Sequence, residues 1–207
     1  MADTIKTVIH YRFLDETPVG RLLLAADDRG LRYLHFEKGR ELSRRPLPPQ
    51  PNQTNSSDVW QADTGQLNEV VHQLQAYFAG QLIQFDLPLE PQGTAFQRKI
   101  WAALSEIPWG ETMTYGELAC SIGQPTASRA VGRANGCNPI SIIIPCHRVI
   151  GSRGKLVGYG GGLNSKKVLL QLENSWPGNR QHQGVFFDKK NTPEPSDAAA
   201  TTAGMYR

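Results

Sequence analysis

Two adjacent residues in the second half of the chain have side chains that can carry out chemistry. Cys146 and His147 lie in ISIIIPCHRVIG, residues 140–151, directly after a run of branched apolar side chains. A cysteine is mostly thiol at neutral pH, with a pKa of about 8.5, and needs a base or a positive environment to become a nucleophile. The pair has three interpretations: a nucleophile with its base, a metal-binding pair, or a small buried cysteine that happens to precede a histidine. For the two residues alone, the third is the most common.

The position of the pair sets how the two side chains can interact. Neighbouring side chains in an extended segment point in opposite directions, so we expect His147 to reach Cys146 through a bend at Pro145 or through one water. The histidine also needs an acceptor that orients it. Glu173 is the candidate, because it ends the last predicted helix and is isolated in an apolar stretch. Cys120 and Cys137 are predicted to be small buried side chains.

Turn and loop residues flank the pair on both sides. Asn138 precedes a proline in NGCNP, where its side chain is predicted to hydrogen-bond backbone groups and tie the segment together. The glycines of GYGGG, residues 158–162, surround Tyr159 and leave backbone N–H groups open to a ligand. The GxxxxGK pattern of a phosphate-binding loop is missing. We therefore predict a flexible lid or wall over a small pocket.

Two short predicted helices form a candidate helix-turn-helix ahead of the pair. The first is TYGELACSIG, with Thr114 as its N-cap, and the second covers residues 126–135 and is closed by Gly136. Arg129 and Arg133 are the long side chains of the second helix, which is otherwise rich in small residues. Such a helix could approach a DNA groove closely, with one arginine projecting into the duplex. Tight helix packing with solvated arginines is the competing interpretation.

The remaining elements predict an α+β chain with two domains. The runs TVIHYRFLD, GRLLLAAD and LRYLHFE are expected to form a small antiparallel sheet, followed by a helix over TGQLNEVVHQLQAYFAG. We place this N-terminal β-meander and helix domain at residues 1–91 with a flexible loop at 43–58, the C-terminal domain at 92–176, and a disordered tail at 177–207.

Three further elements are predicted in the C-terminal domain. TAFQRKIWAALSEI is expected to form its first helix, with Thr94 as N-cap. SIIIP is predicted to be a buried strand or extended core segment. The last helix is LNSKKVLLQLE, and its predicted inward residues are Leu163, Val168, Leu169 and Leu172.

Charge and cysteine content narrow the class of protein. Residues 93–173 hold nine Lys or Arg and four Glu, a net charge of +5, whereas the rest of the chain is −2. This asymmetry suits a C-terminal half that binds a polyanion, although solvated surface charge gives the same pattern.

Three cysteines without a CxxC pair indicate neither a disulfide framework nor a zinc site. Without a membrane-length apolar run or a signal peptide, we expect a cytoplasmic protein, or a nuclear one in a eukaryote.

The order and spacing of five motifs add a resemblance to a known family. TYGELA, SRAVGRANGCNP, IPCHRVIG, GYGGGL and LLQLE together resemble the O6-alkylguanine-DNA alkyltransferases (methylated-DNA–protein-cysteine methyltransferases), over about residues 93–173. The resemblance implies a ribonuclease H-like N-terminal domain and a winged-helix-like, mainly helical C-terminal domain with a helix-turn-helix. It also implies direct-reversal DNA repair. O6-alkylguanine, with O4-alkylthymine as a further candidate, is flipped out of the duplex, and its alkyl group passes irreversibly to the protein's own cysteine, once per molecule.

The resemblance also implies roles for individual residues. Cys146 is the alkyl acceptor, and His147 is its base through a water. Glu173 polarises His147, and Asn138 braces the turn. Arg129 fills the space left by the flipped base. The expected base pocket comprises Tyr115, Val149, Tyr159 and Gly160, with the Val149 carbonyl accepting from the guanine amino group. The other expected DNA-binding residues are Thr126, Ala127, Ser128 and Gly132.

The resemblance also implies binding partners, and a few positions of this sequence differ from the family pattern. It implies a monomer that binds double-stranded DNA through the minor groove and needs no cofactor. Because no cysteine precedes Cys120, we predict no zinc site of the kind that some family members have. Ser141 and Gly160 stand where other members carry different residues, which leaves the preferred alkyl size open.

The competing function is a non-enzymatic alkyltransferase-like protein that flags alkylated DNA for another repair pathway. Such proteins usually carry tryptophan in place of the nucleophile, and Cys146 argues against this function.

Overall fold

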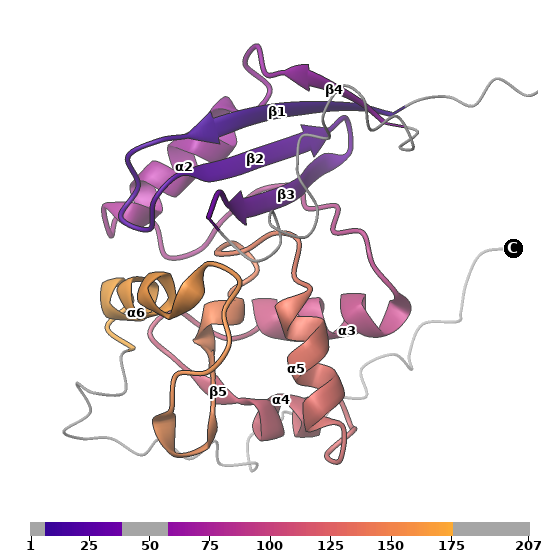
Figure 1. The fold of residues 1–207 in the computed structure, drawn as a ribbon, viewed down its shortest axis with the longest axis vertical. Helices are drawn as coiled ribbons and strands as arrows, with labels where there is room; N and C mark the ends of the chain where they lie inside the picture. Colours follow the sequence, from indigo (N-terminus) through magenta and orange to yellow (C-terminus); the bar gives the residue numbers. More distant parts are fainter. Residues whose placement is uncertain (1–6, 39–57, 176–207) are drawn as a thin grey trace, which may run out of the picture.

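The apolar β runs of the N-terminal half form a four-stranded sheet with one helix packed on it (Figure 1). The protein is described by a computed structural model that covers residues 7–38 and 58–175. The sheet contains β1 (Val8–Leu14), β2 (Leu22–Asp27), β3 (Gly30–Phe36) and β4 (Val59–Ala62), and the helix is α2 (Asn68–Phe78). We call these elements the sheet unit. The predicted loop at 43–58, apart from Asp58, and the predicted tail at 177–207 lie outside the described residues.

The sheet is mixed rather than wholly antiparallel as expected. Its strand order is β3-β2-β1-β4. β1 and β2, and β2 and β3, pair antiparallel, but β1 and β4 pair in parallel, with Val8 opposite Val59. Short turns join the first three strands and force them to run antiparallel, whereas the long connection before β4 permits a parallel pair. β4 has only four residues and is largely exposed, so no alternation of apolar residues indicates it.

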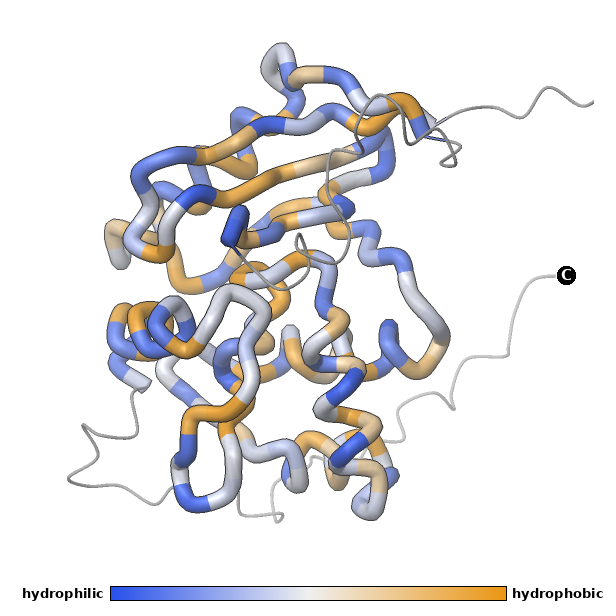
Figure 2. The backbone as a smooth tube through the Cα atoms, in the orientation of Figure 1, coloured by the Kyte–Doolittle hydropathy of each residue, from blue (hydrophilic) through white to orange (hydrophobic). Residues whose placement is uncertain are grey.

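The apolar stripe predicted for the helix of the sheet unit is the face that α2 buries. Val70, Val71, Leu74 and Tyr77 are buried against the sheet. β2 is buried at every position and is coloured as hydrophobic along most of its length (Figure 2). The helix therefore follows from the 3.6-residue period of its side chains, whereas β2 is a short continuous apolar run of the kind found in buried strands.

The second half is mainly helical, and we call it the helical unit. It contains α3 (Ala95–Ser105), β5 (Met113–Thr114), α4 (Tyr115–Ser121), α5 (Ser128–Gly136), η1 (Cys146–Arg148), β6 (Val149–Ile150), η2 (Ser152–Gly154) and α6 (Gly162–Leu172). Thr94 and Thr114 cap α3 and α4 as predicted, and each forms a capping box with the third residue of its helix. The chain thus has the expected α+β class, with a small N-terminal sheet and a helical C-terminal part.

Three local predictions for the helical unit need correction. α5 begins at Ser128 rather than at residue 126, so Thr126 lies in the preceding turn. The SIIIP segment is a turn rather than a strand, since Ile142 has a φ of 72°. Of the predicted inward residues of α6, Leu169 is buried, Val168 and Leu172 are half-buried, and Leu163 is exposed. The buried stripe also carries Lys166 and Leu170.

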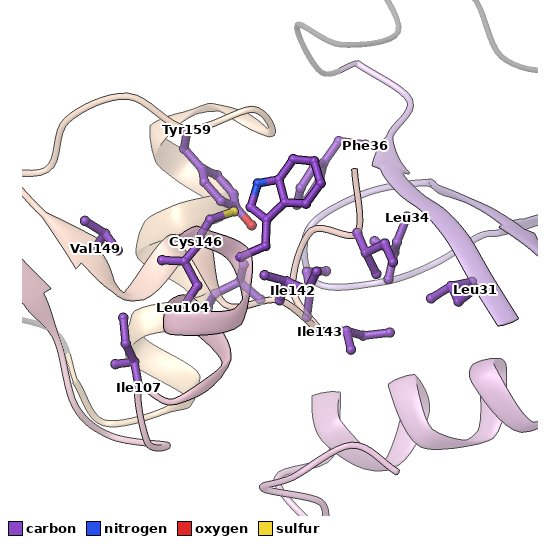
Figure 3. Packing of buried hydrophobic residues seen from close by; sticks show 14 of the residues in the cluster. Leu31, Leu34, Phe36, Leu104, Ile107, Ile142, Ile143, Cys146, Val149 and Tyr159 are labelled. Atoms are coloured by element: carbon purple, nitrogen blue, oxygen red, sulfur yellow. The ribbon is translucent and has the colours of Figure 1, made fainter. Parts of the chain in front are cut away.

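One hydrophobic core runs through both units. Leu34 and Phe36 of β3 lie in the same buried cluster as Ile142 and Ile143 of the helical unit (Figure 3). The outer edge of β3 is also used: the Leu34 N–H donates to the Pro139 carbonyl at 2.9 Å, and the Ser141 N–H donates to the Leu34 carbonyl at 3.1 Å. A sheet edge that would otherwise be open is therefore occupied by the segment that leads to Cys146.

Phe36 also fixes the glycine loop, which gives a test of this interface. A Cβ added at Gly161 would lie 2.6 Å from the Phe36 ring, whereas one added at the neighbouring Gly160 would meet nothing within 4 Å. We expect Gly161→Ala to lower the free energy of unfolding by about 1–3 kcal/mol, measured by urea denaturation, because a well-packed contact must open. Gly160→Ala is the matched control and should keep wild-type stability. Equal stability of the two variants would contradict this packing.

Candidate active site

The Cys146 segment is held in a strained turn by the Asn138 side chain. The Asn138 amide group donates to the Ile144 carbonyl at 2.8 Å, and its carbonyl oxygen accepts from the Ile140 N–H at 3.0 Å. These bonds close residues 138–144 into a loop in which the β-branched Ile142 adopts a left-handed conformation. Such strain persists only where the surroundings enforce it, and it is typical of functional sites. Asn138 therefore braces the turn, as the sequence predicts.

Cys146 opens onto a cavity of about 280 Å³ between α5 and the glycine loop. The thiol is 4% exposed and begins the short helix η1. Tyr115, Tyr159 and Gly160 contribute to the cavity wall, as expected for pocket residues. The remaining lining residues are Gly132, Arg133, Asn135, Gly136, Cys137, Asn138, Ser141 and Gly158. A cavity with one buried nucleophile and several polar groups is the arrangement expected of a ligand site.

Val149 is the predicted pocket residue that the cavity does not include. It is fully buried behind Cys146, and its carbonyl accepts a hydrogen bond from the Lys166 Nζ at 2.6 Å. β6 pairs with β5 at this residue, which keeps its side chain in the core. The Val149 carbonyl, which is expected to accept from the guanine amino group, therefore already accepts a hydrogen bond from Lys166 within the protein.

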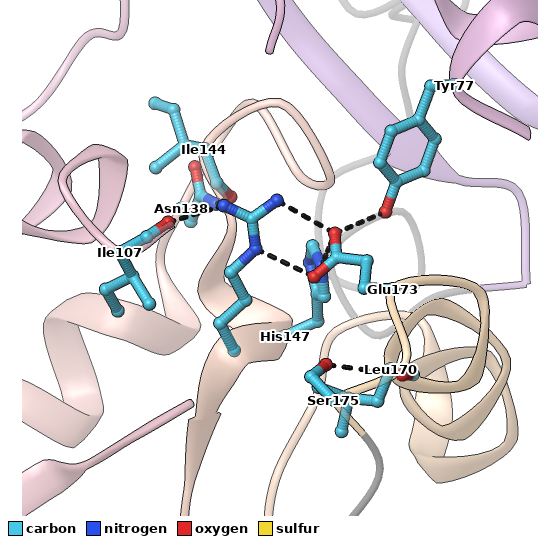
Figure 4. A network of polar contacts seen from close by, with 9 residues as sticks. Tyr77, Ile107, Asn138, Ile144, His147, Leu170, Glu173 and Ser175 are labelled. Carbon is cyan, nitrogen blue, oxygen red and sulfur yellow. Dashed lines mark hydrogen bonds and ion pairs between the residues drawn. The ribbon is translucent and has the colours of Figure 1, made fainter. Parts of the chain in front are cut away.

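The His147 side chain lies against Glu173 (Figure 4). Its Nε2 lies 2.9 Å from Glu173 Oε1, and both side chains are fully buried. Because Glu173 is ionised, Nε2 carries the proton and donates. Nδ1 is then an unprotonated acceptor, and it has no hydrogen-bond partner among the described residues. The histidine is thus prepared to accept one proton at Nδ1.

Arg148 keeps the buried carboxylate ionised. Its Nε donates to Glu173 Oε2 at 2.8 Å and its Nη2 donates to Oε1 at 2.9 Å. Burial alone would raise the pKa of Glu173, but the hydrogen bonds and charges of His147 and Arg148 outweigh it and lower this pKa to about 2. Burial also lowers the pKa of His147, despite the opposing effect of Glu173. The resting pair is therefore carboxylate and neutral imidazole.

The electrostatics of Cys146 favour a thiol at rest. Burial raises the pKa of Cys146, while hydrogen bonds from Asn138 and Ser141 and the charge of Lys166 act in the opposite direction. A thiol of this kind reacts only when a base removes its proton. The next residue along the chain, His147, has an unpaired Nδ1 among the described residues.

Three members of the polar network around Glu173 and Val149 were not among the predicted site residues: Tyr77, Arg148 and Lys166. The Tyr77 hydroxyl donates to Glu173 Oε1 at 2.8 Å. Lys166 is fully buried, donates to the Val149 and Val157 carbonyls, and has its pKa lowered to about 8 by burial. The sequence carried one signal for Lys166: it lies three and four positions before Leu169 and Leu170, on the stripe that α6 buries.

The predicted DNA-binding residues cluster at the start of α5. Arg129 and Thr126 are exposed, and Ala127 and Ser128 are half-buried. Gly132 lies one turn further on, where an added Cβ would be 3.6 Å from the Tyr115 ring. The turn between α4 and α5 thus brings the basic helix end and the cavity to the same part of the molecule.

Cys120 and Cys137 are exposed, which corrects their predicted burial. Cys120 is near the end of α4, and Cys137 follows α5 and borders the cavity. Within residues 7–38 and 58–175, no cluster of three His, Cys, Asp or Glu side chains is arranged to hold a metal ion. In the same part of the chain, none of the helices has the length and apolarity needed to cross a membrane.

A buried thiol that opens onto a cavity, next to a His–Glu pair, is an arrangement in which a cysteine can react. Sequence comparison then gives the family. Residues 9–91 match the model described as "6-O-methylguanine DNA methyltransferase, ribonuclease-like domain". Residues 95–175 match the model of the same family's DNA binding domain. The chain belongs to the 6-O-methylguanine DNA methyltransferase family.

Individual relatives agree with this assignment. A protein of Methanosarcina acetivorans named methylated-DNA–protein-cysteine methyltransferase is 51% identical over 165 residues, which cover 80% of this chain and 99% of the relative. A Mycobacterium tuberculosis protein of the same name is 51% identical over 168 residues, 81% of this chain and 94% of the relative. The crystal structure of Mycobacterium tuberculosis OGT in complex with DNA is similar with a TM-score of 0.69 and 49% identity, covering 80% of this chain and 93% of that chain.

The depressed pKa of Glu173 predicts how stability depends on pH. A carboxyl group with a lowered folded-state pKa stabilises the protein above its unfolded value of 4.5, and this contribution is lost as pH falls toward about 2. Glu173→Gln should therefore cost about 3 kcal/mol at pH 7, since Arg148 is left buried without a charge partner. The deficit relative to wild type should shrink as urea unfolding is measured at lower pH. Glu106→Gln, at an exposed position, is the control, and a pH-independent deficit for Glu173→Gln would contradict the ionised carboxylate.

Proposed function

We propose that this chain repairs alkylated DNA by transferring the alkyl group from O6 of guanine to its own Cys146. Family membership supports a methylated-DNA–protein-cysteine methyltransferase activity and DNA as the partner. The observation that carries the assignment of the acceptor is the buried thiol, which opens into the cavity beside a His147–Glu173 pair with a vacant Nδ1 acceptor. O4-alkylthymine is a second candidate substrate of the same cavity.

The proposed reaction balances without a cofactor. The Cys146 proton passes to His147 Nδ1 through one water, and Glu173 stabilises the imidazolium that forms. The thiolate attacks the alkyl carbon, an S–C bond forms, and the electron pair of the broken C–O bond goes to the guanine, which takes up a proton on its ring. Tyr115, whose ring borders the cavity, is the proposed proton donor to the guanine ring, and the proton held by His147 then returns through water to the tyrosinate, so that both residues end neutral. Because a thioether has no ready route for cleavage in this site, each molecule reacts once.

The cavity wall is suited to a single flipped base. Tyr159 is buried, and its hydroxyl has no hydrogen-bond partner among the described residues. Gly160 offers its backbone N–H at the open side, and the absence of a side chain there leaves room for the alkyl group. Val149 supports Cys146 from behind and holds Lys166. A base must leave the stack to bring its O6 substituent to a buried thiol, so base flipping is part of the proposal.

α5 is the proposed DNA-contacting helix, placed in the minor groove. Small residues at Ala127, Ser128 and Gly132 let its backbone approach the sugar–phosphate chains, and Thr126 stands at its leading turn. Arg129 is exposed at the helix start and would fill the space of the flipped base. The net charge of +5 over residues 93–173 suits binding to phosphates. We propose that the protein acts as a monomer in the cytoplasm, or in the nucleus of a eukaryote.

A non-enzymatic protein that only binds and flags alkylated DNA is the competing function. It would need the helix-turn-helix and the cavity but neither a thiol nor a base. The chain retains Cys146 at the cavity with the His147–Glu173 pair beside it, whereas binding alone requires neither a thiol nor a base. The reactive group therefore favours alkyl transfer.

Intact-mass measurement tests the acceptor directly. After incubation with a duplex oligonucleotide that contains O6-methylguanine, we expect the protein to gain one methyl group, mapped to Cys146 by peptide analysis, with a limit of one per molecule. Cys146→Ala should bind the same duplex with affinity close to wild type and gain no mass. A second equivalent transferred, or a methylated peptide without Cys146, would refute the proposal, and an unmodified duplex is the substrate control.

Arg129→Ala separates base extrusion from chemistry. Flipping costs a few kcal/mol, so loss of the inserted side chain should slow transfer from duplex DNA by about tenfold or more. Transfer from O6-methylguanine in a short single strand, where the base is already unstacked, should change much less. Arg21→Ala removes an exposed charge from the sheet unit and serves as the control. A similar loss of rate on both substrates would argue against the extrusion role.

A further inference from the structure

The sheet unit makes one direct polar contact with the proposed catalytic pair. Tyr77 lies in α2, 96 positions before Glu173 in the sequence, and its hydroxyl donates to Glu173 Oε1 at 2.8 Å (Figure 4). Both side chains are fully buried. The contact therefore joins the sheet unit to the helical unit.

The hydroxyl of Tyr77 has a different role from its ring. The ring packs against Phe85 and Trp109, with centroids 5.2 and 5.4 Å away, so a phenylalanine would fill the same space. Burying a hydroxyl costs free energy that must be offset by a hydrogen bond, and the one it makes is to Glu173. Packing thus accounts for an aromatic ring at position 77, whereas the hydroxyl is needed only for the hydrogen bond to the Glu173 carboxylate.

Three donors converge on one carboxylate oxygen. Glu173 Oε1 accepts from His147 Nε2 at 2.9 Å, from Arg148 Nη2 at 2.9 Å and from the Tyr77 hydroxyl at 2.8 Å. Each donor draws negative charge toward itself and leaves less for the others. The Tyr77 hydroxyl therefore competes with His147 for the charge that would stabilise an imidazolium.

Other ionisable groups near the pair come from each element packed around it. Arg148 of η1 and Lys166 of α6 disfavour a second positive charge on His147. Cys146 and Tyr159 are also close to this group of charges. Within this group of charges, Tyr77 is the residue that comes from the sheet unit. Burial and the charge of Glu173 raise the pKa of Tyr77, so its hydroxyl remains a neutral donor.

We infer that Tyr77 is a positioning residue for the transfer reaction, whose hydroxyl fixes Glu173 Oε1 and keeps His147 neutral until it receives the Cys146 proton. Without that hydroxyl, Glu173 would attract the proton on His147 more strongly, and more of the histidine would be protonated before reaction. A protonated histidine cannot accept the proton of the thiol. This inference rests on the proposed function for the rate, but the state of His147 can be measured independently of it.

The test compares full-length wild type, Tyr77→Phe and Tyr11→Phe. Titration of histidine-labelled protein by 15N NMR gives the pKa of His147 without any substrate. In Tyr77→Phe this pKa should rise by about one unit, the size expected for a lost hydrogen bond to a charged group. The acid limb of the single-turnover methyl-transfer rate should move to higher pH by the same amount, with the plateau rate within about threefold of wild type. Tyr11→Phe removes a hydroxyl from a β1 tyrosine that packs on Phe13 and Trp60, and should change neither quantity.

A second variant keeps the test decisive if Tyr77→Phe folds poorly. 3-Fluorotyrosine at position 77 has a more acidic hydroxyl and is a stronger donor, so it should lower the pKa of His147 instead of raising it. A folded Tyr77→Phe protein with a wild-type His147 titration would overturn the inference, as would a shift of the same sign in both variants. If wild type fails to methylate Cys146, the proposed function is wrong, while the titration still decides the effect of Tyr77 on His147.

Discussion

The structure depends on one buried, ionised carboxylate. Glu173 lies at the end of α6, with no exposed side-chain surface, and accepts hydrogen bonds from α2 through Tyr77 and from η1 through His147 and Arg148. A buried charge is stable only when its hydrogen-bonding capacity is met, and no single element could supply these donors. The need to satisfy this group therefore holds the last helix, the Cys146 segment and the sheet unit in one arrangement.

The same arrangement makes the reactive segment rigid. Asn138 closes the turn from within, the β3 edge binds Pro139 and Ser141 from outside, and the core around Ile142 enforces a left-handed isoleucine. A flexible cysteine would lose conformational freedom on reaction and would be open to solvent oxidants. A thiol that is 4% exposed at the base of a cavity is instead accessible mainly to a group that fits the cavity.

Sequence patterns predicted much of this, because the determinants were local. The capping residues Thr94 and Thr114 and the apolar stripe of α2 follow from contacts within a few positions. The order of motifs around PCHR indicated the family. The failures were all non-local: the parallel β4, the turn at Ile142 and the exposed Leu163 depend on what packs against each segment. The exposed Cys120 and Cys137 show that residue type alone is a poor guide to burial.

The same distinction between local and non-local determinants holds for the residues of the candidate site. The sequence by itself identified Cys146, His147, Glu173 and Asn138 as candidate site residues, from residue types, spacing and the family motifs. It could not assign Tyr77, Arg148 and Lys166, which are ordinary residues in their local context. Only the tertiary structure brings Tyr77 and Arg148 to the same carboxylate and places Lys166 against the Val149 carbonyl. The physical reason is that protonation states are set by burial and by neighbours in space, and neither is encoded by adjacency along the chain.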